Sequence, residues 1–182
     1  MDGSFAVAAV SYERAAAMIE PDSKIYLDAG STCLELAKLL APRTDITVVT
    51  NSLVVAQEML GLPNVTVVMP GGTLHHDTVS LVDADGLAAL EKYHIQKGFF
   101  GAYGLSLTAG LTDVSAQEVA VKRPLVAMCH EVIAVLDATK WGRTGVASFA
   151  ELVDVDTIIT DVNAPSDPVS QVESMEVEVI LV

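Results

Sequence analysis

Small and polar residues follow several apolar, β-rich runs of this sequence, at positions where an anion could bind. The first of these runs leads into Asp28-Ala29-Gly30-Ser31-Thr32. Gly30 permits a tight turn, and the hydroxyl of Ser31 or Thr32 can cap the helix that follows. Free N–H groups and the positive end of a helix dipole bind anions such as phosphate. The same residues also suit an ordinary strand-to-helix turn, so both interpretations stay open.

Two further runs end in residues of the same kind. Thr50-Asn51-Ser52 places polar side chains where a helix would begin, and Gly71 and Gly72 remove side chains where a ligand would come close. Each segment also has an ordinary interpretation, which is helix capping for the first and a glycine turn for the second.

Two pairs of charged residues could also bind a ligand. Glu118 and Lys122 are four residues apart on a predicted helix, where they would form an ion pair along its surface. Alternatively, both side chains face a ligand pocket formed where the apolar runs end, and there they bind phosphate and hydroxyl groups. Asp137 and Lys140 follow another apolar run, and a lysine just beyond a strand end is well placed to meet a phosphate. We favour ligand binding for Lys140.

Motifs for common catalytic or cofactor sites are absent from the sequence. It has no Ser/His/Asp order, Walker sequence or GxGxxG. The adjacent His75 and His76 have no further spaced ligands, so we interpret them as loop residues rather than a metal site. Cys33 and Cys129 lack CxxC spacing and are too few for a disulfide framework. We therefore expect no metal, no cofactor and a reduced, cytoplasmic setting.

Apolar runs alternate with amphipathic stretches along the chain. The strands and helices that this alternation predicts would position the candidate binding residues. We predict strands at 24–28, 46–50, 65–69, 98–102, 131–136 and 157–160, a short strand at 78–82, and a last strand in the tail. Helices are predicted at 4–20, 32–40, 52–60 and 84–90, with a loop at 105–114. Ser115 and Glu118 form a capping-box pattern for a further helix, which Pro124 should kink or divide. The alternation predicts βαβ units and a parallel sheet buried on both faces.

The composition favours one compact domain over residues 1–182. With 182 residues, 51% of them hydrophobic, the chain can bury a full core. Its apolar runs are shorter than the roughly 18 residues of a membrane span. The formal net charge of −14 would repel phosphate backbones, so the chain alone should not bind DNA or RNA. An anionic metabolite remains compatible, because the donors within a pocket matter more than the total charge.

A set of short motifs occurs in order from about residue 19 to residue 161. These are LDAGST, VVTNSLVVA, MPGGTL, SLV, FFGAYGLS, GLT, E-x-x-x-K, LDATKWGR and IITD. Their order and spacing resemble the C-terminal sensor domain of DeoR-family bacterial transcriptional repressors, and the apolar tail fits the same pattern.

The resemblance implies an α/β fold with an open, mostly parallel, doubly wound Rossmann-like sheet and helices on both faces. It is the fold type of ribose-5-phosphate isomerase, CoA-transferase-like proteins and glucosamine-6-phosphate deaminase. Family members bind phosphorylated sugars or related intermediates. In the intact repressor an N-terminal helix-turn-helix domain binds the operator, and effector binding alters how that domain binds the operator. The implied protein is a homo-oligomer that reaches DNA through a domain outside this chain.

The resemblance also assigns roles to residues of this sequence. It implies that phosphate is held by Gly30, Ser31, Thr32 and Lys140. It places around the sugar Asp28, Asn51, Gly71, Gly72, Gly104, Glu118 and Lys122.

The sequence departs from the family pattern in several places. The helix-turn-helix segment is absent, and Asp83 follows SLV where the family usually has Gly. His75 and His76 stand where Arg is frequent, and Pro124 lies in a helix that is usually uninterrupted. The histidines would change the effector contacts in that loop, and Pro124 would change the direction in which the Lys122 side chain points.

We therefore interpret the chain as an effector-sensing domain rather than an enzyme. One rival is an active sugar-phosphate isomerase or deaminase, with Asp28, Glu118 or Asp137 as general base. The other rival is an oligomerisation module whose pocket is unused. The sequence does not identify the effector.

Overall fold

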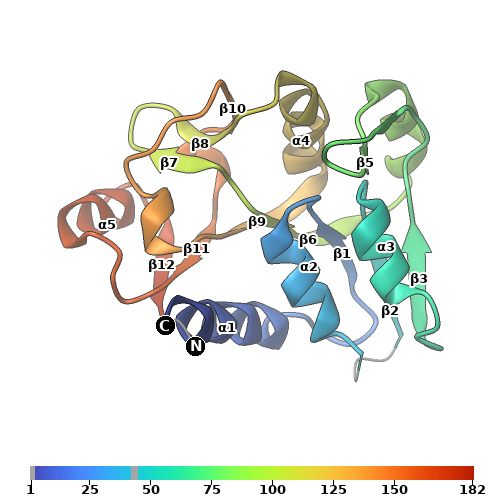
Figure 1. The fold of residues 1–182 in the computed structure, drawn as a ribbon, viewed down its shortest axis with the longest axis horizontal. Helices are drawn as coiled ribbons and strands as arrows, with labels where there is room; N and C mark the ends of the chain where they lie inside the picture. The colour runs from blue at the N-terminus through green and yellow to red at the C-terminus, as the bar shows by residue number, and fades with distance from the viewer. Residues whose placement is uncertain (1–2, 42–44) are drawn as a thin grey trace.

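A parallel sheet runs through the centre of the molecule (Figure 1). The computed structural model describes residues 3–41 and 45–182. The seven strands lie in the order β12-β11-β9-β6-β1-β2-β3, and every pairing is parallel. They comprise β1 (Lys24–Leu27), β2 (Ile46–Val49), β3 (Val65–Val68), β6 (Ile95–Phe100), β9 (Cys129–Val135), β11 (Thr157–Thr160) and β12 (Glu178–Leu181). The predicted open, doubly wound sheet is confirmed.

The strand order reverses between β1 and β6, which are neighbours in the sheet although they are far apart in sequence. At such a reversal the connections leave on opposite faces and open a crevice at the carboxyl ends of the strands. Gly30, Asn51, Gly72 and Lys140 follow β1, β2, β3 and β9, so all four lie beyond the carboxyl ends of parallel strands. These four candidate residues therefore share one edge of the sheet.

Helices cover both faces of the sheet. The helices are α1 (Gly3–Ala17), α2 (Ser31–Lys38), α3 (Leu53–Met59), α4 (Ala116–Met128) and α5 (Ser166–Glu173). Because side chains alternate along a strand, Ile25 and Leu27 pack in one core with α1, α2 and α3. Tyr26 points to the opposite core, which includes residues of α4 and α5. This alternation places the Tyr26 ring beneath α4 rather than α2.

A small antiparallel sheet occupies the region that we predicted as a loop at 105–114. It pairs β7 (Gly104–Ser106) and β8 (Gly110–Asp113) with β10 (Ala147–Ala150), in the order β10-β8-β7. The loop prediction was wrong because Gly110 serves close packing: a Cβ there would lie 2.1 Å from the Ala150 carbonyl oxygen. Neither β10 nor α5 was predicted from the sequence.

Short elements complete the fold. The hairpin of β4 (Leu74–His75) and β5 (Ser80–Leu81) contains the predicted short strand, and η1 (Ala84–Leu90) is a 3₁₀ helix over the predicted helical range. Two more 3₁₀ turns are η2 (Ala138–Lys140) and η3 (Leu152–Asp154).

Helix α4 runs without interruption through Pro124, so the prediction that this proline divides the helix was wrong. Proline removes one helix hydrogen bond, that from its own N–H to the carbonyl group four residues earlier, and its ring crowds that carbonyl group. Leu125 and Val126 are buried in the core just after it, and this packing holds the helix together. Among the described residues, no helix combines the length and apolarity needed to cross a membrane.

Candidate ligand site

A buried carboxylate marks the centre of the crevice. Asp28 follows β1 and is completely buried. Its Oδ1 accepts the N–H of Ala29 at 2.8 Å, and its Oδ2 accepts the N–H of Gly101 at 3.2 Å. Since Gly101 directly follows β6, these bonds join the two strands at which the strand order reverses.

Lys122 reaches this carboxylate from α4. Its Nζ lies 2.7 Å from Asp28 Oδ2 and 2.7 Å from Asp113 Oδ2, and 5.0 Å from the centre of the Phe149 ring. Burial alone would lower the pKa of Lys122, but the negative charges of Asp28 and Asp113 outweigh it, so the pKa is raised. Two carboxylates therefore neutralise this ammonium group inside the protein.

The alternative of a surface ion pair between Glu118 and Lys122 is wrong. Both residues are 4% exposed, and Lys122 pairs with Asp28 and Asp113 instead. The buried carboxylate of Asp28 and the partly buried one of Asp113 together attract the ammonium group more strongly than one neighbour on a helix surface.

Tyr26 links Asp28 to the next strand. Its hydroxyl donates to Asn51 Oδ1 at 2.9 Å and lies 3.4 Å from Asp28 Oδ1. The Asn51 amide in turn donates from Nδ2 to the Leu81 carbonyl at 3.2 Å. Burial, followed by the charge of Asp28, raises the pKa of Tyr26, which keeps its hydroxyl protonated as a donor. Asn51 is thereby fixed in orientation at the end of β2.

Glu118 faces the β4–β5 hairpin. Ser115 caps α4 by accepting the N–H of Glu118 at 3.2 Å, as predicted. The Glu118 carboxylate, however, accepts a 2.5 Å hydrogen bond from the Ser80 hydroxyl. Thr78 Oγ1 lies 2.7 Å from Ser80 Oγ and 3.3 Å from His75 Nδ1, so polar contacts continue into the hairpin.

The proposed phosphate cradle begins helix α2. Gly30 is the N-cap, and no side chain caps this end, so the expected cap by Ser31 or Thr32 is not formed. Thr32 packs beside Gly101, where a Cβ would lie 3.7 Å from Thr32 Cβ. Thr32 also lines a small cavity of about 20 Å³ together with Asp137. The first turn of α2 and the turn after β9 therefore face each other.

Lys140 ends this second turn. Asp137 Oδ1 accepts the N–H of Thr139 at 2.8 Å, and Asp161 Oδ2 accepts the N–H of Ala138 at 2.6 Å, which fix the backbone of η2. The Lys140 side chain is half-buried, and in the part of the chain that is described it forms no ion pair.

The predicted glycines lie where chain segments pack closely. Gly72 has φ +130°, and a Cβ there would lie 2.7 Å from Asp83 Cβ. Gly71 lies against Gly86, where a Cβ would be 2.2 Å from the Gly71 carbonyl oxygen. At Gly104 a Cβ would lie 2.3 Å from the Arg143 carbonyl oxygen. Chain packing alone thus requires glycine at 72 and 104, whereas a Cβ at Gly71 itself would lie 4.0 Å from Gly86 Cα and would meet no clash.

The structure brings together Asp28, Asn51, Thr32, Glu118 and Lys122 at the strand ends. Sequence reasoning missed three participants, which are Tyr26, Ser80 and Asp113. Ser80 lies within the SLV motif, but only tertiary contacts reveal its bond to Glu118. Across the described ranges, no three His, Cys, Asp or Glu residues are grouped in a way that could hold a metal ion.

Comparisons with known proteins show which family the chain resembles. Residues 12–162 match the DeoR C-terminal sensor domain. The HTH-type transcriptional regulator GolR of Listeria innocua is 34% identical over 82% of this chain and 59% of its own length. The HTH-type transcriptional repressor GlcR of Bacillus subtilis is 32% identical over 81% of this chain and 56% of its own length. The matched region is therefore less than two thirds of either relative.

A solved structure supports the fold alone. Ribose 5-phosphate isomerase A from Methanocaldococcus jannaschii superposes with a TM-score of 0.55 at 14% identity, over 74% of this chain and 53% of that chain.

Proposed function

The chain belongs to the family of DeoR C-terminal sensor domains, and from this premise we propose that it binds a phosphorylated sugar and controls a DNA-binding domain. The observation that carries the proposal is the buried cluster of Asp28, Asp113 and Lys122 where the strand order reverses. The DNA-binding domain would be a helix-turn-helix segment outside this chain, and the regulator would be a cytoplasmic homo-oligomer.

In this proposal the sugar and the phosphate of the ligand contact different groups of the protein. Asp28, Asn51 and Glu118 offer oxygen and amide groups that suit sugar hydroxyls. The uncapped N–H groups at the start of α2 suit the phosphate, with Lys140 as the counter-charge. Lys122 is already neutralised by two carboxylates, so its role is to orient Asp28 rather than to balance phosphate.

Sensing follows from differential affinity. A ligand shifts an equilibrium only by the difference between its affinities for the two states. The Ser80–Glu118 hydrogen bond joins the β4–β5 hairpin to α4. A sugar hydroxyl that competes for the Glu118 carboxylate would change this contact and move the hairpin relative to the helix.

Catalysis is disfavoured by the same contacts. The matched relatives carry the names of transcriptional regulators. The Asp28 oxygens already accept the N–H groups of Ala29 and Gly101 and contact the Lys122 ammonium group, so they are occupied by partners within the protein rather than placed to take a proton from a substrate. Turnover of ribose 5-phosphate or glucosamine 6-phosphate by the purified chain would overturn the proposal that it is not an enzyme.

A thermal-shift screen of phosphorylated sugars, each beside its unphosphorylated counterpart, tests the proposal. A ligand at about 100 times its Kd should add about 2.7 kcal/mol to the unfolding free energy. Stabilisation by a phosphorylated member alone supports the proposal. No stabilisation by any phosphosugar would favour an oligomerisation module instead.

A further inference from the structure

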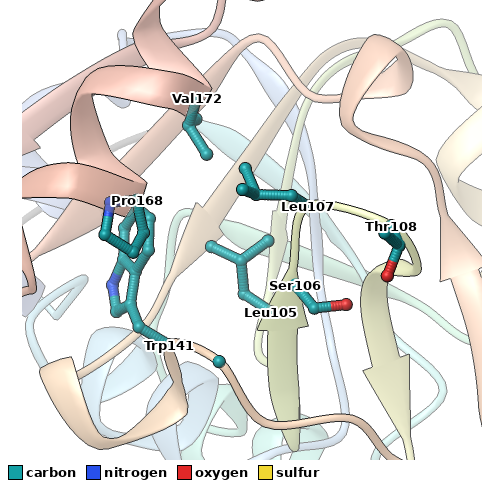
Figure 2. Close-up of a pocket in the computed structure, with 8 residues that line it drawn as sticks. Leu105, Ser106, Leu107, Thr108, Trp141, Pro168 and Val172 are labelled. Carbon is teal, nitrogen blue, oxygen red and sulfur yellow. The ribbon is translucent and has the colours of Figure 1, made fainter.

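An apolar pocket of about 180 Å³ lies apart from the Lys122 cluster, between the β7–β8 hairpin and α5 (Figure 2). Leu105 and Leu107 of the hairpin face the rings of Trp141 and Pro168 across it, and Val172 of α5 closes one side. The remaining lining residues are Ser106, Thr108 and Gly142. None of these eight residues belongs to the polar contacts of the candidate ligand site.

The chemistry of the pocket is uniform. None of its described lining residues carries a charge. The indole N–H of Trp141 already donates to Thr160 Oγ1 at 3.1 Å, and Ser106 Oγ already accepts the N–H of Ala109 at 3.1 Å. Leu107 remains 38% exposed at the rim, so apolar surface faces water there. Covering such surface is favourable because it removes apolar area from water.

We propose that this pocket binds a compact, uncharged, apolar molecule about the size of one aromatic ring. An apolar cavity of about 150 Å³ is known to admit benzene, so this volume suits a ring with one small substituent. Three separate segments contribute walls, which gives the site a concave shape typical of ligand pockets. The inference does not depend on phosphosugar binding.

Binding in the pocket acts on the turn that carries Lys140. The N–H of Gly142 donates to the Leu105 carbonyl at 2.8 Å, and the N–H of Arg143 donates to the Lys140 carbonyl at 3.3 Å. Leu105 and Trp141 also form a β-bridge. A ligand against Trp141 therefore perturbs the Gly142 amide as well as the indole.

Titration of the ¹⁵N-labelled chain with toluene, followed by NMR, tests the proposal. Trp141 is the one tryptophan of the sequence, so its indole signal is unambiguous. We expect saturable shifts of the Trp141 indole and the Gly142 amide. Benzoate, similar in shape but charged, should bind at least about tenfold more weakly because its carboxylate would lose water in the pocket.

Two variants block the site in different ways. Val172→Phe fills it from α5, and toluene affinity should fall at least about tenfold. Because Val172 is buried, Thr108→Phe provides a second block from an exposed rim position. Val153→Phe, at a residue 79% exposed outside the pocket, is the matched control and should leave the titration unchanged.

Three results would overturn the proposal. They are absence of saturable shifts at Trp141, equal affinity for toluene and benzoate, and unchanged toluene affinity in Thr108→Phe. Loss of the toluene shifts as protein concentration rises would also contradict it, because a second copy of the chain would then occupy the pocket.

Discussion

Two lysines lie near the same edge of the sheet in opposite surroundings. Lys122 is 4% exposed and contacts two carboxylates at 2.7 Å. Lys140 is half-buried at the end of η2 and forms no ion pair with the residues that the structure describes. A charge that the protein has already neutralised cannot neutralise a ligand as well. We therefore propose different roles for the two lysines: Lys122 stabilises the site through its two carboxylates, and Lys140 binds the anion.

The largest expected effect is on folding stability. Lys122→Met should lower the free energy of unfolding by about 3–5 kcal/mol, because Asp28 and Asp113 lose their buried partner. Lys140→Met is the matched control and should stay within about 0.5 kcal/mol of the wild type. Urea denaturation measures both. Equal, small changes in the two variants would contradict the division of roles.

The stability due to Lys122 should also depend on alkaline pH. Its pKa is raised in the folded protein, so its contribution is complete below the pKa of an unfolded lysine, about 10.4. The contribution is lost as pH rises through the folded pKa. Urea denaturation of wild type and Lys122→Met should thus show a difference that shrinks above about pH 10.4.

The pKa of Tyr26 is also raised in the folded protein, so the stability that Tyr26 contributes is likewise lost as pH rises. Repeating the urea denaturation of both proteins, with and without Lys122→Met, in a Tyr26→Phe background isolates the contribution of Lys122. A wild-type advantage that stays constant up to high pH in this background would exclude Lys122 as its source.

A smaller effect is expected at the β4–β5 hairpin. Ser80→Ala removes a donor from the buried Glu118 carboxylate and should cost about 1–3 kcal/mol of unfolding free energy. Ser170→Ala, on the exposed part of α5, is the control and should have little effect. Thermal denaturation distinguishes the two. If Ser80→Ala matched the control, the bond would contribute nothing to joining the hairpin and α4.

No effect at all is expected when duplex DNA is added to this chain. The sequence has 10 Lys and Arg against 24 Asp and Glu, so the phosphate contacts that give non-specific affinity are missing. Fluorescence anisotropy of a labelled random duplex at micromolar protein and physiological salt measures this. Binding under those conditions would place a DNA surface within the sensor itself.

Local pattern was sufficient for the first half of the fold. Strands β1, β2 and β3 and helices α2 and α3 follow one another with short turns, so alternation alone predicted them. The second sheet was not predictable in this way, because β8 pairs with β10 across more than thirty residues of sequence. Its glycines resemble a loop in sequence, yet in the structure they permit close backbone contact.

The residues of the candidate site likewise fall into those that local pattern marks and those that it does not. Asp28, Asn51 and Lys122 were candidates because they follow strands or lie on a patterned helix, but only the family resemblance placed them around a sugar. Tyr26 and Asp113 acquire their roles only when distant elements meet, and neither is marked by a local motif. The alternative of a Glu118–Lys122 ion pair was wrong for the same reason, since helix spacing does not reveal the competing carboxylates of Asp28 and Asp113.

Calorimetric titration of Lys140→Ala tests the central claim most directly, with a phosphosugar that stabilises the wild type and its unphosphorylated counterpart as ligands. The account predicts a roughly ten- to hundredfold loss of affinity for the phosphosugar, about 1.5–3 kcal/mol, and little change for the counterpart. Equal, small losses for both ligands would contradict it, because Lys140 would then be a surface charge with no phosphate to bind.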